Sequence, residues 1–206
     1  RLLEARHHDP FAVLGRHPSH GVEIFRALLP HAETARIGAD GPDMQRIPGT
    51  DLFERHVEHG NGIPQHYSIH WQDKSGRTGS HVDPYTFPPQ LPDFDLYLFG
   101  EGRHHHIYRI LGAHLCSVDG VEGVLFATWA PNAERVSVVG DFNAWDGRPH
   151  CMRSRGSSGV WELFIPGLQA GCFYKFEIRT RDGAVLPLKA DPYAREAQLR
   201  PATASV

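Results

Sequence analysis

The sequence has few cysteines, no long apolar stretch and no excess of basic charge, and each of these absences excludes a class of protein. The three cysteines, Cys116, Cys151 and Cys172, are odd in number and form no C-x-x-C pair, so a reduced, cytoplasmic protein is expected. No apolar run approaches the length of a membrane span. The formal net charge is −3 with scattered basic residues, which excludes the electrostatic footprint of nucleic-acid binding. We therefore expect neither a membrane nor nucleic acid as a partner.

Histidine is abundant, with 15 residues, but the histidine spacing does not predict a metal site. The densest cluster is His104-His105-His106. Consecutive side chains point in different directions on a helix or a strand, so three in a row rarely bind one ion. No H-E-x-x-H or comparable spacing is present. We expect neither a metal nor a cofactor.

The first half of the chain has the pattern of an antiparallel β-sandwich. A short helical start over residues 1–8 is expected, and Asp9-Pro10 stops or restarts it. Glycine, proline, asparagine and aspartate then separate short runs rich in β-branched and aromatic residues. These runs predict strands at 22–29, 34–37, 52–57 and 66–71.

The second half repeats landmarks of the first half at a nearly constant spacing. Pro30-His31-Ala32-Glu33 is matched by Pro131-Asn132-Ala133-Glu134, 101 residues later. Four further landmarks recur 107 or 108 residues later: Phe53-Glu54, Tyr67, Gly76 and Asp83-Pro84-Tyr85. Such a repeat indicates an internal duplication. The spacing grows by about seven, so the second copy is expected to be longer in the region that follows Asp141.

The fold predicted from these patterns is all-β, with two tandem immunoglobulin-like antiparallel β-sandwiches joined by a short, partly helical linker. The expected divisions are 1–90, 91–111 and 112–206. In the linker, Asp93 is expected to cap a short helix. The linker is dense in large apolar residues, so we expect it to pack against both domains rather than to act as a solvated tether.

The second copy contains the most informative loop. Strands are expected at 124–129, 135–139, 159–165 and 173–180, with Trp161, Leu163 and Ile165 on one face of the third. After the second strand, turn-forming residues surround an aromatic pair in the sequence DFNAWDG. Trp145 in this loop either forms a platform on which a glucose ring stacks or packs under its own loop.

These motifs resemble carbohydrate-binding module family 48, the β-sandwich that precedes the catalytic barrel in branching enzymes. The matching patterns are F-x-x-W-A-P-N-A, V-x-V-x-G-D-F-N-x-W-D-G-R and Y-K-F-E, and D-P-F-A-V-L-G and L-G-A-H are similar to bacterial glycogen branching enzymes. The resemblance covers nearly all 206 residues. It implies the amino-terminal part of a 1,4-α-glucan branching enzyme of the α-amylase superfamily.

The resemblance also implies where catalysis takes place. A retaining mechanism needs two carboxylates about 5–5.5 Å apart, which this family places on a barrel of roughly 250 residues. Two sandwiches already account for the chain, so we expect no catalytic residue in it and expect residue 206 to lead into the barrel. Glu134, Asp141 and Glu162 are interpreted as solvated acidic residues. The barrel of the same polypeptide is an expected partner.

By the same resemblance, Trp145 and Lys175 belong to a sugar site, with Asn143 and Arg148 placed to orient hydroxyls. The expected ligands are α-glucans: glycogen, amylose and malto-oligosaccharides. Relatives usually carry a second tryptophan where this sequence has Ala184-Val185, so weak binding is expected. Three alternatives stay open: Trp145 and Arg148 support the barrel interface, the chain is a stand-alone regulatory glycogen-binding module, or the sandwiches serve only protein contacts.

Overall fold

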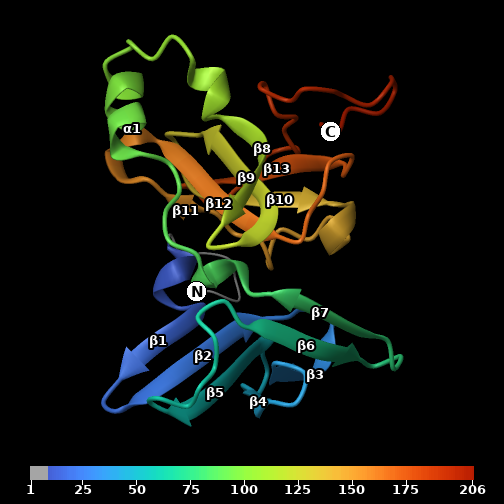
Figure 1. Ribbon diagram of the computed structural model, residues 1–206. Coiled ribbons are helices and arrows are strands. Elements are labelled where there is room, and N and C mark those ends of the chain that lie inside the picture. The colour runs from blue at the N-terminus through green and yellow to red at the C-terminus, as the bar shows by residue number, and fades with distance from the viewer. Residues whose placement is uncertain (1–8) are drawn as a thin grey trace. The chain divides into compact units, whose positions relative to one another are not determined.

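The computed structural model describes residues 9–206, which form two compact units, Pro10–Phe87 and Pro88–Val206 (Figure 1). The predicted helical start at 1–8 lies outside the described residues. No helix in the described part of the chain is long and apolar enough to cross a membrane. The second unit begins at Pro88 and so includes the segment expected to be a separate linker. The three-part division of the chain stays a prediction.

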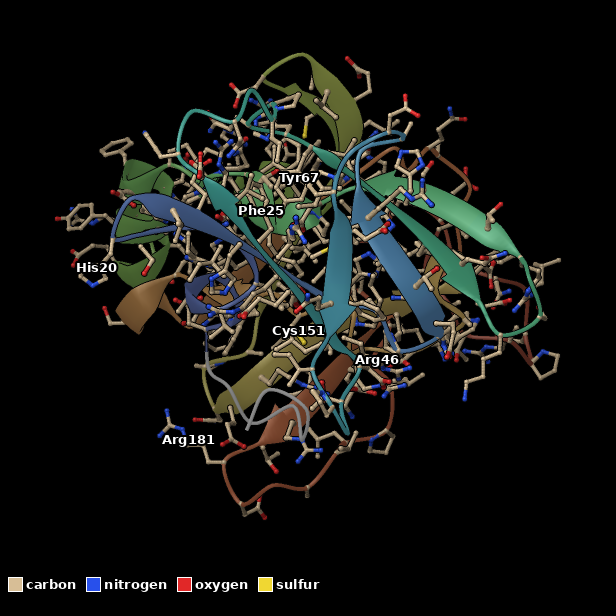
Figure 2. All side chains as sticks on the ribbon, turned by 90° about the horizontal axis from the view of Figure 1, so that it is seen from below. His20, Phe25, Arg46, Tyr67, Cys151 and Arg181 are labelled. Carbon is tan, nitrogen blue, oxygen red and sulfur yellow. The ribbon has the colours of Figure 1, made fainter. Side chains whose placement is uncertain are left out.

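The first unit is built from seven antiparallel strands in the order β1-β2-β5-β4-β3-β6-β7. Its core contains Phe25, Phe53 and Ile69, which are fully buried. Phe25 meets the ring of Tyr67 edge to face at 5.0 Å, and both are labelled in Figure 2. The strands are β1 (Gly15–Ser19), β2 (Val22–Leu28), β3 (Ala32–Ile37), β4 (Asp43–Arg46), β5 (Leu52–Glu58), β6 (Ser68–Asp73) and β7 (Thr78–Val82), and 3-10 helices span Pro10–Ala12 and Pro84–Thr86.

The second unit has a four-stranded sheet, β11-β12-β9-β8, and a two-stranded sheet, β10-β13. All of its strand pairs are antiparallel. The strands are β8 (Gly112–Val118), β9 (Val121–Trp129), β10 (Ala133–Gly140), β11 (Arg153–Ser154), β12 (Val160–Pro166) and β13 (Tyr174–Thr180). The helices are α1 (Asp93–Gly100) and 3-10 helices at Ile107–Arg109, Asp141–Asn143 and Gly156–Ser158. The all-β prediction is therefore confirmed.

The predicted duplication is confirmed by matching strand pairs and by one repeated buried hydrogen bond. Strands β8, β9 and β12 pair as β1, β2 and β5 do, and β10 pairs with β13 as β3 does with β6. The Tyr67 hydroxyl donates to Asp83 at 2.6 Å, and the Tyr174 hydroxyl donates to Asp191 at 2.6 Å. Each aspartate also accepts the backbone N–H of the tyrosine two residues further on. This geometry explains why the D-P-Y sequence occurs twice.

The two copies differ most in the length of one loop, as the change in spacing predicts. Five residues, 38–42, connect β3 to β4, whereas twelve residues, 141–152, connect β10 to β11. The extra seven residues include Trp145. We call residues 141–152 the platform loop.

The segment that precedes β8 covers the outward face of the four-stranded sheet. Leu91 and Leu111 form a cluster with Ala127 and Val160, and side chains of α1 and of the following turn pack against it. Because both faces of β12 are covered, every residue of Val160–Pro166 is buried. Trp161, Leu163 and Ile165 alternate with Glu162 and Phe164 along β12 and so share one face, as predicted, and the opposite face is buried as well.

The predicted start of the linker helix was wrong by one residue. Pro92 occupies the N-cap position with an extended backbone, and Asp93 is the first helical residue. The Asp93 carboxylate does not cap the helix, because it pairs instead with the Arg155 guanidinium at 2.7 Å. An aspartate in the first turn still interacts favourably with the helix dipole.

Candidate functional site

Trp145 lies in the platform loop directly after a 3-10 turn that ends β10. Ala144 and Trp145 both have left-handed backbone conformations, with φ of 52° and 61°. Non-glycine residues adopt this region only where surrounding contacts hold them there. The Trp145 N–H donates to the Gly140 carbonyl at 3.0 Å, and the indole N–H donates to Asp141 at 3.1 Å. The indole is 37% exposed, so the loop presents it to solvent in a fixed orientation.

Asn143 determines the shape of the platform loop. Its Oδ1 accepts the Gly140 N–H at 2.9 Å, and its Nδ2 donates to the Val138 carbonyl at 2.9 Å. The same Nδ2 lies 2.9 Å from Nδ1 of His150. Nδ2 carries two hydrogens, and these contacts use both of them, while Oδ1 uses one of its acceptor sites. Asn143 therefore holds the strand end and the loop together beneath Trp145.

The two basic residues of the predicted site also have protein partners. Arg148 Nε and Nη2 pair with the carboxylate of Asp146, the closest contact being 2.7 Å. Lys175 pairs in register with Val139, and its ammonium donates to Thr203 Oγ1 at 2.7 Å. Gly140 pairs with Tyr174, so Lys175 lies at the same end of the β10-β13 sheet as the platform loop.

The platform loop crosses the outward face of the β10-β13 sheet. A Cβ at Gly147 would lie 2.7 Å from the carboxylate of Glu177 and 3.0 Å from Cβ of Ser137. A side chain here would require the Glu177 carboxylate or the loop to shift, so glycine suits this close approach. Cys151 ends the crossing, with its thiol 3.4 Å from the Ser137 hydroxyl, and burial raises the pKa of this thiol. A buried, protonated thiol is chemically inert, so Cys151 serves packing.

One predicted surface acid is buried and structural. Glu162 is 2% exposed, and its two oxygens accept the backbone N–H groups of Gln90 and Leu91 at 3.0 and 2.8 Å. The Arg155 guanidinium lies 3.0 Å away and compensates the charge. The interpretation of Glu162 as solvated was wrong, because residues about 70 positions away in sequence cover it. Asp141, in contrast, is exposed.

The hairpin that follows β13 lacks an aromatic ring. Val185, at the position where the resemblance implies a second tryptophan, is 49% exposed. The residues described hold no group of three or more histidine, cysteine, aspartate or glutamate side chains placed to bind a metal. The platform loop therefore offers one indole for stacking, and Asp141 and Lys175 supply hydrogen-bonding groups at the same end of the sheet.

The second unit is an antiparallel sandwich with an exposed indole on a loop and a lysine at the same end of the β10-β13 sheet, and its sequence matches a carbohydrate-binding module. Residues 110–194 match carbohydrate-binding module 48 (isoamylase N-terminal domain), and residues 1–85 match the N-terminal domain of the alpha-1,4-glucan branching enzyme GlgB. The chain belongs to the 1,4-α-glucan branching enzyme family and corresponds to its amino-terminal region.

Three relatives illustrate the similarity. The chain is 63% identical to the 1,4-alpha-glucan branching enzyme GlgB of Methylococcus capsulatus, 55% to that of Nitrosococcus oceani and 56% to that of Thiobacillus denitrificans. Each match covers 100% of this chain and 28% of the relative. The chain thus spans somewhat more than a quarter of the length of these relatives. A pullulanase structure from Anoxybacillus sp. LM18-11 aligns with 93% of this chain and 27% of its own at 13% identity, but its TM-score of 0.38 is too low to support an argument.

Proposed function

We propose that this chain is the non-catalytic amino-terminal part of a cytoplasmic 1,4-α-glucan branching enzyme, and that it supports the catalytic barrel and contacts α-glucan weakly. In this proposal the whole enzyme cleaves an α-1,4 bond and transfers the freed chain to a 6-hydroxyl, with catalysis in the barrel. The relatives, all named as branching enzymes, favour this role over a stand-alone regulatory module. Cys116, Cys151 and Cys172 form no disulfide with one another, which agrees with a reducing compartment.

The exposed Trp145 indole carries the glucan-binding proposal. The left-handed backbone and the Asp141 hydrogen bond fix the ring before any ligand arrives, which reduces the entropy lost on binding. The glucose C–H face stacks on the ring, and the Lys175 ammonium donates to sugar hydroxyls. A stacked ring contributes about 1–3 kcal/mol, a figure taken from nucleic-acid bases. With a single ring and solvated polar groups, the dissociation constant for glycogen or a malto-oligosaccharide is about 1 mM.

The test is an NMR titration of the 206-residue chain with maltoheptaose. The backbone amides of Gly147 and Lys175 and the indole N–H of Trp145 are expected to shift saturably at about millimolar ligand. Trp145→Ala abolishes the amide shifts. The control, Trp129→Ala, removes a more exposed indole from β9 and leaves them unchanged. Equal shifts in wild type and Trp145→Ala would place the site elsewhere, and an absence of shifts at saturating ligand would refute the proposal.

A further inference from the structure

His150 lies near the end of the platform loop and connects the loop to β10. Its backbone carbonyl accepts the Val138 N–H at 3.0 Å. Its ring meets the Phe142 ring edge to face at 5.6 Å, and its Nδ1 lies 2.9 Å from Nδ2 of Asn143. Phe142 and Asn143 belong to the 3-10 turn that precedes Trp145. His150 therefore joins the strand to the turn that carries the exposed indole.

The hydrogen bonds of Asn143 determine which nitrogen of the His150 ring carries a proton. Asn143 Oδ1 accepts the Gly140 N–H and Nδ2 donates to the Val138 carbonyl, so the amide cannot be turned over without losing both bonds. Nδ2 therefore faces the imidazole as a donor. Nδ1 of His150 has to accept this hydrogen bond, which requires a neutral imidazole with its proton on Nε2.

A protonated His150 does not fit this arrangement. Both ring nitrogens of an imidazolium are donors, so an N–H at Nδ1 would face an N–H of Asn143 across 2.9 Å. The two groups would have to move apart, and one hydrogen of the amide would lose its partner. A histidine side chain ordinarily changes charge between about pH 5 and 8. Protonation of His150 therefore displaces the residue that shapes the platform loop.

Asn143 acts on Trp145 through Gly140. The Gly140 N–H is bound by the Asn143 amide, and the Gly140 carbonyl accepts the Trp145 N–H at 3.0 Å. The left-handed conformations of Ala144 and Trp145 persist only while the surrounding contacts hold them. Displacement of Asn143 therefore releases the indole from its fixed orientation.

The other charged groups on the elements that surround the loop do not titrate in the same range. Carboxylates ordinarily titrate below about pH 5, and lysine and arginine above about pH 10. Burial raises the pKa of the Cys151 thiol, which therefore stays protonated. The charged groups are Asp141, Asp146 and Arg148 in the loop, Arg135 on β10, and Lys175, Glu177 and Arg179 on β13.

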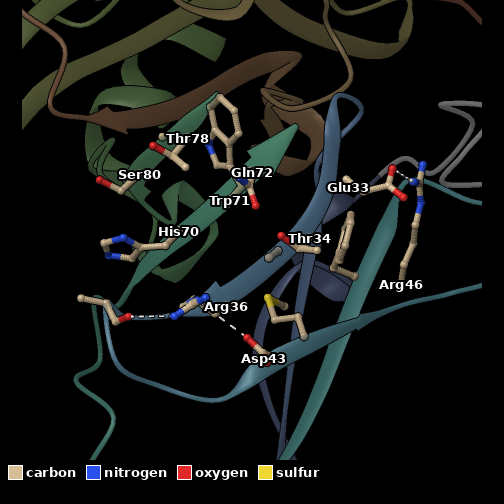
Figure 3. A pocket seen from close by; sticks show the side chains of 15 residues that line it. Glu33, Thr34, Arg36, Asp43, Arg46, His70, Trp71, Gln72, Thr78 and Ser80 are labelled. Atoms are coloured by element: carbon tan, nitrogen blue, oxygen red, sulfur yellow. Dashed lines mark hydrogen bonds and ion pairs between the residues drawn. The ribbon is translucent and has the colours of Figure 1, made fainter. Parts of the chain in front are cut away.

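The first copy indicates that the sandwich does not depend on this loop. There only five residues connect β3 to β4, and the same outward face is an open groove lined by polar side chains, among them Thr34, Arg36 and Gln72 (Figure 3). The strands beneath it pair as they do in the second copy. Loosening of the platform loop therefore changes how Trp145 is presented and leaves the sandwich folded.

We propose that His150 is a positioning residue for the Trp145 platform, and that the charge of its ring sets the affinity for α-glucan. The neutral ring holds the indole ready for stacking, and the charged ring releases it. The choice of ligand rests on the proposed function. Malto-oligosaccharides should therefore bind more weakly as the pH falls from about 7.5 to about 5.

The test is a titration of the full 206-residue chain with maltoheptaose at both pH values, followed by NMR on the Gly147 amide. The affinity is expected to be about fivefold lower at the lower pH, as the loss of one hydrogen bond requires. His150→Ala should bind weakly at both pH values. His150→Asn places an oxygen acceptor near the position of Nδ1 and does not titrate, so it should restore the affinity and remove the pH dependence.

Two controls separate this effect from other titrations. His105→Asn removes an exposed histidine outside the platform loop and should keep the pH dependence of the wild type. Burial raises the pKa of Asp191 in the same unit, and His150→Asn keeps that carboxylate. Without ligand, long-range proton–nitrogen NMR spectra should show an unprotonated Nδ1 on His150 at neutral pH. The Trp145 indole N–H should follow the titration of His150 in wild type and not in His150→Asn.

The outcomes distinguish the positioning role from the proposed function. A proton on Nδ1 at neutral pH, or the same pH dependence in wild type and His150→Asn, overturns the positioning role. Maltoheptaose binding with equal affinity at both pH values also overturns it and leaves the proposed function standing. If maltoheptaose binds at neither pH while the Trp145 indole still follows His150, the proposed function fails and the positioning of the indole by His150 stands.

Discussion

Replacing Glu162 by glutamine should destabilise the second unit strongly, because this buried carboxylate fastens the segment before α1 to the sheet. Its oxygens accept the N–H groups of Gln90 and Leu91 and face the Arg155 guanidinium. Glutamine keeps the volume but removes the charge and replaces one acceptor with an NH₂ group. That group then meets either a backbone N–H or the guanidinium, so a buried donor loses its partner.

The size of the destabilisation by Glu162→Gln follows from the contacts of Glu162 and Arg155. Breaking a buried ion pair costs about 3–5 kcal/mol, and hydrogen bonds to charged groups contribute about 1.5–3 kcal/mol each. Arg155 keeps its contacts with Asp93 and the Leu91 carbonyl, at 2.7 Å each, so the lower end applies. We expect Glu162→Gln to lower the free energy of unfolding of the second unit by about 3 kcal/mol.

The duplication supplies the matched control. Glu54 occupies the corresponding position in β5 and pairs with Arg26 at 2.5 Å, but it is a quarter exposed. Such a pair contributes about 1 kcal/mol or less, so Glu54→Gln should have little effect. Urea unfolding is followed on the Trp161 indole N–H, which donates to the Ala130 carbonyl in the second unit, and on Trp71 in the first. If Glu162→Gln lowers the free energy of unfolding no more than Glu54→Gln does, the buried carboxylate does not stabilise the second unit in this way.

Three further predictions concern pH, the platform loop and catalysis. Burial raises the pKa of Asp83 to about 6, so the folded first unit binds the carboxyl proton more tightly than the unfolded chain does. The free energy of unfolding of the first unit should therefore fall by up to about 3 kcal/mol as pH rises from about 4 to about 6. Urea titrations of wild type and Asp83→Asn should diverge across that range, and parallel curves would contradict this. Gly147→Ala should push the platform loop off Glu177 and weaken maltoheptaose binding at Trp145 while Trp161 keeps its unfolding midpoint; an unchanged affinity would show that the loop tolerates a Cβ. Incubation of the chain with amylose should yield no new α-1,6 linkages by NMR, and their appearance would place catalysis in these residues.

The strands that the sequence predicts well are those with dense apolar patterns. The expectation at 22–29 corresponds to β2, that at 52–57 to β5, and that at 135–139 to β10. Strands β1 and β7 were not predicted, because they lie at sheet edges and are made largely of polar residues. Edge strands bury little side-chain surface, and they form because a neighbouring strand satisfies their backbone groups.

The platform loop was predicted from its turn-forming residues, and the seven-residue change in spacing placed it in the second copy. The internal use of Asn143 was not predictable, because it depends on how the loop folds back onto Val138 and His150. The burial of Glu162 depends on a segment about 70 residues earlier in the chain.

Contact of this amino-terminal region with α-glucan through Trp145 can be measured by native electrophoresis in gels that contain glycogen. We expect wild type to migrate more slowly as the glycogen content of the gel rises, Trp145→Ala to be retarded less, and Trp129→Ala to behave as wild type. Retardation that is the same for wild type and Trp145→Ala, or mobility of the wild type that does not depend on glycogen, would contradict it.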